Sequence, residues 1–162
     1  MRKKPVSIED ALVRMEIKCA AAEHCSSEIR ISLIRQGLSP GDIAKIIDSL
    51  RSRGFIDDGR FARAFVRDKY RFSAWGRHKI SAALRAKQID RSLIEDAMEE
   101  IDQREYVRTA FRTVASRLRL IPDGDDPRKV REKLLRFGAS RGYEPGLIMK
   151  ILDSERLWQS RK

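Results

Sequence analysis

The stretch "GLSPGDIAKIIDSLR" at residues 37–51 decides the fold, because a near-copy, "GYEPGLIMKILDSER", follows at residues 142–156. The two stretches align without a gap and are identical at nine of fifteen positions. Unrelated segments of average composition would share roughly one identity over this length. The chain therefore contains a repeat, and a repeat indicates that one structural unit is used more than once.

The residue types in each copy match the end of one helix, a turn and the start of the next helix. Gly37 suits the left-handed conformation just past a helix, Ser39 can cap the following helix and Pro40 fits its first position. Isoleucine and leucine then recur at three- and four-residue spacing in both copies, which is typical of one buried helical face. Both copies therefore predict a corner between two helices.

A third, more diverged copy, "QIDRSLIEDAMEEID" at residues 88–102, lies between the outer two and has Gln88 where they have glycine. Each corner is preceded by two helical segments, which we place near residues 8–24 and 26–36, 58–72 and 76–87, and 102–119 and 126–141. No run alternates apolar and polar residues in the manner of a strand. We therefore predict an all-α protein of three tandem three-helix repeats, stacked into an elongated, curved body.

The spacing of these segments also predicts where the units begin and end. Repeat 1 is expected at residues 8–57, repeat 2 at 58–102 and repeat 3 at 103–157. A basic N-terminal tail at residues 1–7 and a C-terminal tail at 158–162 would flank them. Each unit is too small to bury much core alone, so neighbouring units are expected to stack.

The composition favours a basic protein without a membrane segment. Of the 162 residues, 41% are hydrophobic, and the formal net charge is +11, which favours acidic partners such as nucleic acid or an acidic protein surface. Cys19 and Cys25 lack the paired spacing of a zinc site, so we interpret them as ordinary reduced thiols. No window approaches the roughly 20 apolar residues of a membrane span. We therefore predict a cytoplasmic protein with no membrane partner.

The basic charge is concentrated in the second and third repeats. Residues 60–91 contain ten Lys or Arg against two acidic residues, and residues 104–141 contain eleven against five, whereas residues 8–59 contain seven against nine. Arginines on the first helix of repeat 2 share an arc of roughly 80° at about 100° per residue, and a similar stripe follows on the first helix of repeat 3. Uncompensated like charges at this spacing destabilise a helix, so we interpret the stripes as a binding surface. The candidate partner- or DNA-binding residues are Arg60, Arg63, Arg67, Arg71, Arg77, Lys79, Arg85, Lys87, Arg104, Arg108 and Arg112.

The sequence carries no recognisable catalytic or metal-binding pattern. His24 and His78 lie in separate repeats without a matching serine or cysteine motif. Asp57 and Asp58 directly precede a predicted helix, so we interpret them as caps and not as a metal pair. The acidic stretch "DGDD" at residues 123–126 lacks the later ligands of a calcium loop, and no glycine-rich phosphate loop is present. We predict a non-enzyme with no catalytic residue, no metal, no cofactor and no small-molecule substrate.

The middle of the chain resembles the core of the RecX family of bacterial regulatory proteins. The resemblance covers "RGFIDDGRFARAFVRDK" at residues 53–69, "WGRHKISAALRAKQI" at 75–89 and "LIEDAM" at 93–98, and Gln88 replaces the usual corner glycine. The stretch "RGY" at residues 141–143 is similar to the last unit of the family. The positions that meet the family pattern are Gly54, Phe55, Ile56, Asp57, Asp58, Arg60, Phe61, Ala62, Gly76, Lys79, Ile80, Leu84, Lys87 and Ile89.

This resemblance implies a cytoplasmic protein that binds the RecA recombinase and its nucleoprotein filament. Members of the family mostly inhibit recombinase activities, including strand exchange and ATP hydrolysis, in homologous recombination, DNA repair and the SOS response. An elongated basic monomer is suited to lie along a filament groove that presents acidic protein surface and DNA phosphates. Two alternatives stay open: a DNA-binding protein that competes for the strand through non-specific contacts to the phosphate backbone, and a helical scaffold for another acidic partner.

Overall fold

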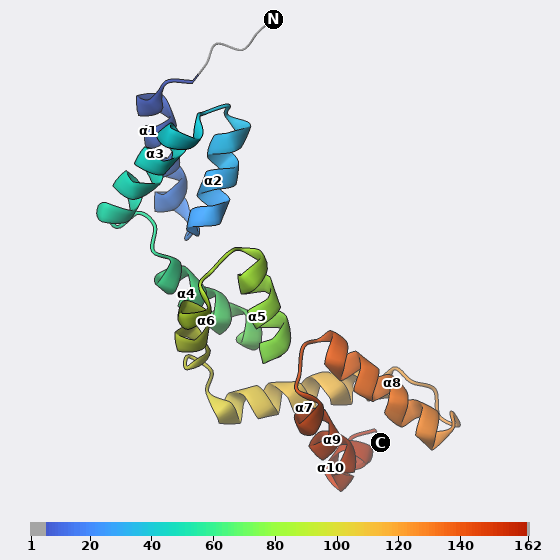
Figure 1. The fold of residues 1–162 in the computed structure, drawn as a ribbon. Coiled ribbons are helices and arrows are strands. Elements are labelled where there is room, and N and C mark those ends of the chain that lie inside the picture. The colour runs from blue at the N-terminus through green and yellow to red at the C-terminus, as the bar shows by residue number, and fades with distance from the viewer. Residues whose placement is uncertain (1–5, 162) are drawn as a thin grey trace, which may run out of the picture.

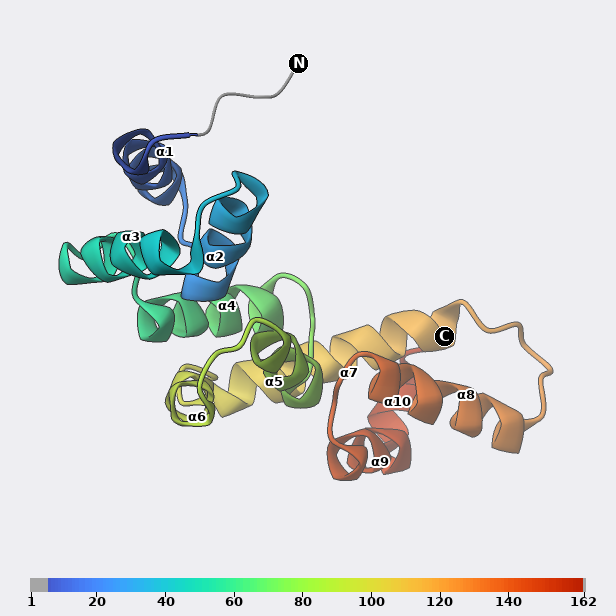
Figure 2. The same cartoon turned by 45° about the horizontal axis from the view of Figure 1, so that its top comes forward.

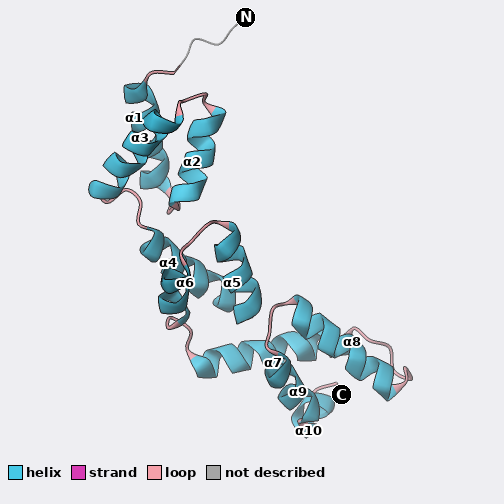
Figure 3. Cartoon of the chain, in the orientation of Figure 1, coloured by secondary structure: helices cyan, strands magenta, loops and turns pink. Residues whose placement is uncertain are grey.

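The computed structural model describes residues 6–161, and every regular element within that range is an α-helix (Figure 3). The helices are α1 (Ile8–Ala21), α2 (Ser26–Arg35), α3 (Pro40–Ser52), α4 (Asp58–Arg71), α5 (Arg77–Ala86), α6 (Arg91–Met98), α7 (Gln103–Arg119), α8 (Pro127–Ser140), α9 (Pro145–Asp153) and α10 (Glu155–Gln159). The predicted all-α fold class is confirmed.

The helices form three groups that follow one another along an elongated, bent body (Figure 1). The groups are α1 to α3, α4 to α6 and α7 to α10, and we call them repeats 1, 2 and 3. The short helix α10 was not predicted, and it runs across the proposed boundary between repeat 3 and the C-terminal tail. Of the predicted N-terminal tail, residues 1–5 lie outside the described range.

The three corners between the second and third helices of each repeat share one backbone geometry. Gly37 and Gly142 have φ of 84° and 88°, and Gln88 has φ of 59° at the equivalent position. Gln88 thus takes the left-handed conformation that glycine adopts more readily. The Ser39 hydroxyl accepts a hydrogen bond from the Asp42 amide at 3.2 Å, which confirms the predicted cap of α3.

The three repeats are not equally independent, because the buried residues form two cores and not three. Repeat 1 has its own core, to which Ile29, Leu33 and Leu50 contribute fully buried side chains. Repeats 2 and 3 share one continuous core that runs from α4 to α10 and includes the buried rings of Tyr106 and Tyr143. Two of the three stacked units therefore form one folded body, and repeat 1 is attached to it.

Repeats 2 and 3 also meet through their backbones. The Gly76 amide donates a hydrogen bond to the Arg141 carbonyl at 2.7 Å, and the His78 amide donates one to the Gly142 carbonyl at 3.0 Å. A Cβ atom added to Gly76 would lie 2.2 Å from the carbonyl carbon of Gly142. Glycine is required at this contact because no side chain fits between the two backbone segments.

Repeat 1 is attached mainly through the loop and first residues of α2, which lie beside α4 and α5 (Figure 2). The Ser26 amide donates a hydrogen bond to the Asp58 carboxylate at 2.7 Å, and the Ser27 hydroxyl donates one to the Lys87 carbonyl at 2.6 Å. Cys25 is fully buried in the core of repeats 2 and 3. Asp58 therefore caps a helix of the preceding repeat, while Asp57 caps α4 by accepting from the Arg60 amide at 2.9 Å.

Candidate functional site

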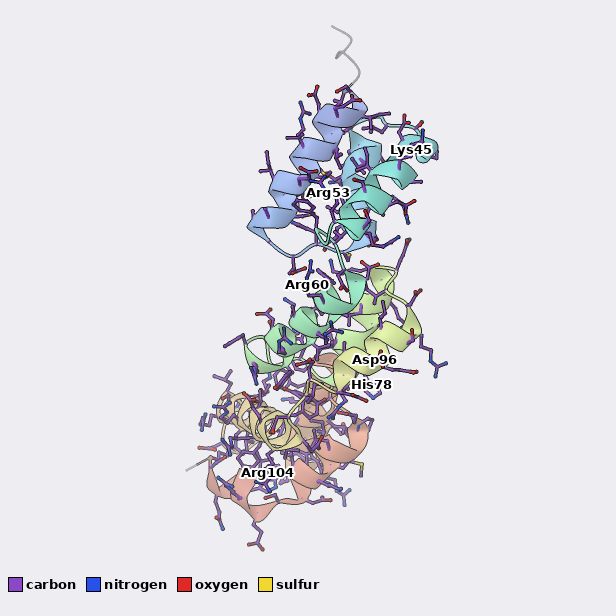
Figure 4. All side chains as sticks on the ribbon, turned by 90° about the vertical axis from the view of Figure 1, so that its left-hand side faces the viewer. Lys45, Arg53, Arg60, His78, Asp96 and Arg104 are labelled. Carbon is purple, nitrogen blue, oxygen red and sulfur yellow. The ribbon has the colours of Figure 1, made fainter. Side chains whose placement is uncertain are left out.

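The arginine stripe on α4 is largely occupied by ion pairs. The pairs are Arg60 with Glu23 of repeat 1 at 2.6 Å, Arg67 with Glu100 of repeat 2 at 3.0 Å, and Arg71 with Glu105 of repeat 3 at 3.3 Å. Figure 4 shows Arg60 at the junction between the first two repeats. The premise that this stripe is uncompensated is therefore wrong for three of its four arginines. Arg63 is half-buried and has no carboxylate within 4.0 Å in the described range.

Lys87 is held at the junction between repeats 1 and 2. Its Nζ atom lies 2.5 Å from one Glu28 carboxylate oxygen, and Nδ1 of His24 lies 2.9 Å from the other. Burial raises the pKa of the Glu28 carboxyl, but the hydrogen bonds from Lys87 and His24 outweigh it and bring the pKa below its ordinary value. Glu28 is thus an ionised link between two repeats, and Lys87 is not free to meet a partner.

Arg77 is held at the junction between repeats 2 and 3. Its guanidinium lies 3.0 Å from the Glu144 carboxylate and 4.2 Å from the centre of the Tyr106 ring. The Tyr106 hydroxyl donates to the other Glu144 oxygen at 2.7 Å. Burial and the hydrogen bond to Glu144 raise the pKa of Tyr106, and the bonds from Tyr106 and Arg77 overcome burial to lower the pKa of Glu144. This network joins the repeats.

The two remaining candidates of repeat 2 have no carboxylate partner among residues 6–161. Lys79 is half-buried, with its Nζ atom 4.6 Å from the centre of the Trp75 ring. Arg85 is exposed and donates a hydrogen bond to the Ser81 hydroxyl at 3.2 Å. Both lie on α5 and not on the helix that carries the α4 stripe.

The stripe on α7 is different, because its arginines are exposed and unpaired. No carboxylate lies within 4.0 Å of Arg104, Arg108 or Arg112 in the part of the chain that the structure describes, and Figure 4 places Arg104 in the last repeat. The helix holds the stripe outward because its opposite face is buried, with Tyr106 and Val114 in the shared core. The three side chains follow one another at one helical turn, about 6 Å apart along the axis.

Beside this stripe runs a groove with an apolar floor, which we call the α7 groove. Two adjoining hollows of ≈ 430 and ≈ 710 Å³ form it, and both are lined by Gln103, Val107 and Phe111. Leu147 and Ile151 of α9 extend the floor. The rim consists of five cations without a carboxylate partner among the described residues, namely Arg104, Arg108, Arg112, Lys150 and Arg156.

Lys150 and Arg156 were missed as candidates, because they lie in the repeated stretch that we interpreted as architecture. They correspond to Lys45 and Arg51 of the first copy, and all four are among the identical positions of the repeat. In the structure the Arg156 guanidinium lies 5.3 Å from the centre of the Phe111 ring and closes one side of the groove. Their identity in both copies was the available signal, but it did not distinguish a surface residue from a structural one.

The α7 groove can hold a negatively charged group. Guanidinium groups bind carboxylates and phosphates through paired hydrogen bonds. Among the described residues the only carboxylate that lines the groove, that of Glu144, is already bound to Arg77. No group of three or more metal-ligating side chains is found within residues 6–161. None of the helices of the described range is both long and apolar enough to cross a membrane.

Known proteins share this sequence and this fold. The family description "RecX, second three-helix domain" matches residues 57–98. The chain is 32% identical over 133 residues to the regulatory protein RecX of Prosthecochloris aestuarii, covering 81% of this chain and 83% of that protein. It is 29% identical over 132 residues to the regulatory protein RecX of Mycobacterium sp. (strain KMS), covering 80% and 72%.

A solved structure agrees in fold. The crystal structure of RecX from Lactobacillus salivarius superposes with a TM-score of 0.80 at 22% identity, covering 94% of this chain and 97% of that chain. The matched residues of the family description span α4 to α6, the repeat that the sequence resemblance also identified. The chain belongs to the RecX family of regulatory proteins.

Proposed function

We propose that the protein regulates the RecA recombinase by binding its nucleoprotein filament, and that it inhibits recombinase activity in homologous recombination and DNA repair. The binding surface is the basic surface of repeats 2 and 3, centred on the α7 groove. The observation that supports this proposal is the row of unpaired cations on α7. Arg60 and Arg71 of α4, by comparison, already form ion pairs with carboxylates of the neighbouring repeats.

The shape and charge of the molecule support such a surface. A nucleoprotein filament presents DNA phosphates and acidic side chains in a long helical groove, and an elongated bent body can follow a groove over several contacts (Figure 1). Exposed cations without partners need not break an existing ion pair when they bind an anion. Their attraction also acts over a Debye length of about 8 Å at physiological salt, which favours rapid encounter.

The test measures inhibition of RecA ATP hydrolysis on single-stranded DNA by the wild type and by the triple variant Arg104→Glu, Arg108→Glu, Arg112→Glu. We expect the concentration for half-inhibition to rise at least about a hundredfold, since each lost charge contact is worth roughly tenfold. The matched control is Arg30→Glu, Arg35→Glu, Lys45→Glu, which changes the net charge equally at exposed positions of repeat 1 that form no ion pair among residues 6–161. Wild-type inhibition by the folded α7 variant would refute the surface assignment.

A second candidate function is direct, sequence-independent DNA binding that competes with the recombinase for the strand. The one-turn spacing of Arg104, Arg108 and Arg112 favours it, because a row of exposed arginines can contact successive phosphates. Binding of labelled single-stranded DNA without recombinase should then weaken with salt, with a log-log slope of about −0.7 per phosphate contacted. If the protein inhibits RecA at concentrations where it leaves free DNA unbound, this second function fails and the first stands.

A further inference from the structure

The α7 groove has a property that phosphate binding does not require, namely its apolar floor. Val107, Phe111 and Leu147 are half-buried, and Ile151 is buried beneath them. Phosphate groups contact the cationic rim and gain nothing from an apolar surface that remains in water. The floor therefore indicates a partner that carries apolar side chains as well as negative charge.

The equivalent positions of repeat 2 show that this floor is uncovered in repeat 3. The first helices of the two repeats align with Ala62 opposite Val107 and Val66 opposite Phe111. Ala62 and Val66 are fully buried, whereas Val107 and Phe111 are only half-buried. The same face of the first helix is thus covered in one repeat and open in the other, which leaves room for a segment from a partner.

The surroundings of Phe111 disfavour a nucleic-acid base as the occupant. Stacking requires an accessible ring face, and single-stranded nucleic acid is usually held by such faces. The Phe111 ring is half-buried, and the guanidinium of Arg156 already lies 5.3 Å from its centre. The floor is therefore better suited to aliphatic side chains that pack from above.

We propose that the α7 groove binds an acidic amphipathic segment of a partner protein, with apolar side chains one helical turn apart and Asp or Glu residues between them. Val107 and Phe111 are themselves one turn apart, so they match that spacing along the groove. The five rim cations complement the acidic residues, and the hollows of ≈ 430 and ≈ 710 Å³ have the size of ordinary ligand sites. This proposal rests on the proposed function, since it assigns the chemistry of the partner at the same surface.

The test uses the full chain and three fluorescent probes in anisotropy titrations. The first probe is a designed peptide of about four helical turns, with leucine at one-turn intervals among glutamates. The second has the same composition with the leucines spread around the helix, and the third is a single-stranded oligothymidylate. We expect the wild type to bind the first peptide about tenfold more tightly than the second, because only the first presents its leucines to the floor together.

Two sets of variants separate the floor from the rim. Val107→Ser with Leu147→Ser should weaken the patterned peptide about tenfold and leave the oligothymidylate unchanged. Arg108→Gln with Arg112→Gln should weaken all three probes. The milder variant Val107→Ala is measured alongside, so that the floor can still be tested if the double variant fails to fold. Thermal unfolding shows whether each variant is folded.

Equal binding of the two peptides by the wild type would overturn the proposal. A floor variant with wild-type affinity for the patterned peptide would also overturn it. So would a floor variant whose affinity for the oligothymidylate falls as much as its affinity for the patterned peptide. Inhibition of RecA is measured separately on the same variants. Specific peptide binding without inhibition would refute the proposed function alone, whereas inhibition without a preference between the peptides would refute only this inference.

Discussion

Helices α4 and α7 begin successive repeats and carry arginines in register, yet three of the four α4 arginines form ion pairs and the three α7 arginines form none within the described range. Arg63 aligns with Arg108, and Arg67 with Arg112. On α4, Arg60 and Arg71 form ion pairs with the repeats on either side, Arg67 forms one within repeat 2, and Arg63 forms none among residues 6–161. On α7 the whole stripe stays exposed beside an open groove. Similar local sequence therefore produces mostly paired arginines in one repeat and exposed arginines without a carboxylate partner in the next.

The difference arises from what lies across from each helix. Helix α4 is in the middle of the body, with Glu23 of repeat 1 near one end and Glu105 of repeat 3 near the other. Helix α7 packs against α4 of repeat 2 and against α8 and α9 of its own repeat, and within the described range none of these helices places a carboxylate within 4.0 Å of its arginine stripe. An arginine stripe is thus available to bind a partner only where the surrounding repeats supply no carboxylate.

The largest expected effect comes from breaking the contact that fixes repeats 2 and 3 together. Gly76→Ala places a Cβ atom 2.2 Å from the Gly142 backbone, which cannot move aside without separating the α4 to α5 loop from the α8 to α9 corner. We expect a loss of about 3 kcal/mol in the free energy of unfolding, measured by urea denaturation. Gly146→Ala is the control, because its Cβ meets open space. An equal cost at both positions would contradict the close backbone contact.

A smaller expected effect is the difference in stability between variants that lose the α4 arginines and variants that lose the α7 arginines. Replacing Arg60, Arg67 and Arg71 of α4 by Gln removes three partly exposed ion pairs, so we expect a loss of about 1.5 kcal/mol at low salt. The same replacement of Arg104, Arg108 and Arg112 on α7 removes like charges one turn apart and one hydrogen bond, from Arg112 to the Thr109 hydroxyl at 3.3 Å. It removes no ion pair within the described range, so stability should change by no more than about 0.5 kcal/mol.

Urea denaturation of both triple variants at low and high salt measures this difference. Each variant loses three positive charges, so net charge alone would shift both equally. High salt should shrink the gap, because it screens exposed ion pairs. If the two variants lose the same stability at low salt, the α4 arginines do not join the repeats as the structure indicates.

Most of the local architecture could be predicted from the sequence, because it depends on residues close together in the chain. The corner at Gly37 and Ser39 and the cap at Asp57 follow from rules that act over three or four residues. The helix α10 was missed because it is only five residues long and begins directly after the end of α9. Gln88 was the one corner residue whose type disagreed with its conformation.

The candidate surface was only half predictable, because pairing and exposure depend on residues far apart in the chain. Arg67 and Glu100 are 33 positions apart, and Arg77 and Glu144 are 67 apart. No periodicity in the sequence connects such partners. Likewise Val66 and Phe111 occupy the same register in their repeats, and only the packing of the other helices shows which of the two is covered.

The smallest expected effect comes from removing the carboxylate partner of one α4 arginine, so that this arginine is left unpaired as the α7 arginines are. Glu105 accepts hydrogen bonds from Arg71 at 3.3 Å and from the Tyr70 hydroxyl at 3.2 Å, so Glu105→Gln should free the Arg71 charge. Stability should fall by no more than about 0.5 kcal/mol. Affinity for single-stranded oligothymidylate, measured by anisotropy at fixed salt, should rise about two- to threefold, since one more cation becomes available beside α7.

The control for this change is Asp96→Asn, which alters the net charge equally at an exposed residue of repeat 2 that forms no ion pair within the described range (Figure 4). An equal rise in both variants would mean that the oligonucleotide responds to total charge and not to the release of Arg71. A rise in Glu105→Gln alone would show that a carboxylate from the next repeat is what keeps an α4 arginine out of the binding surface.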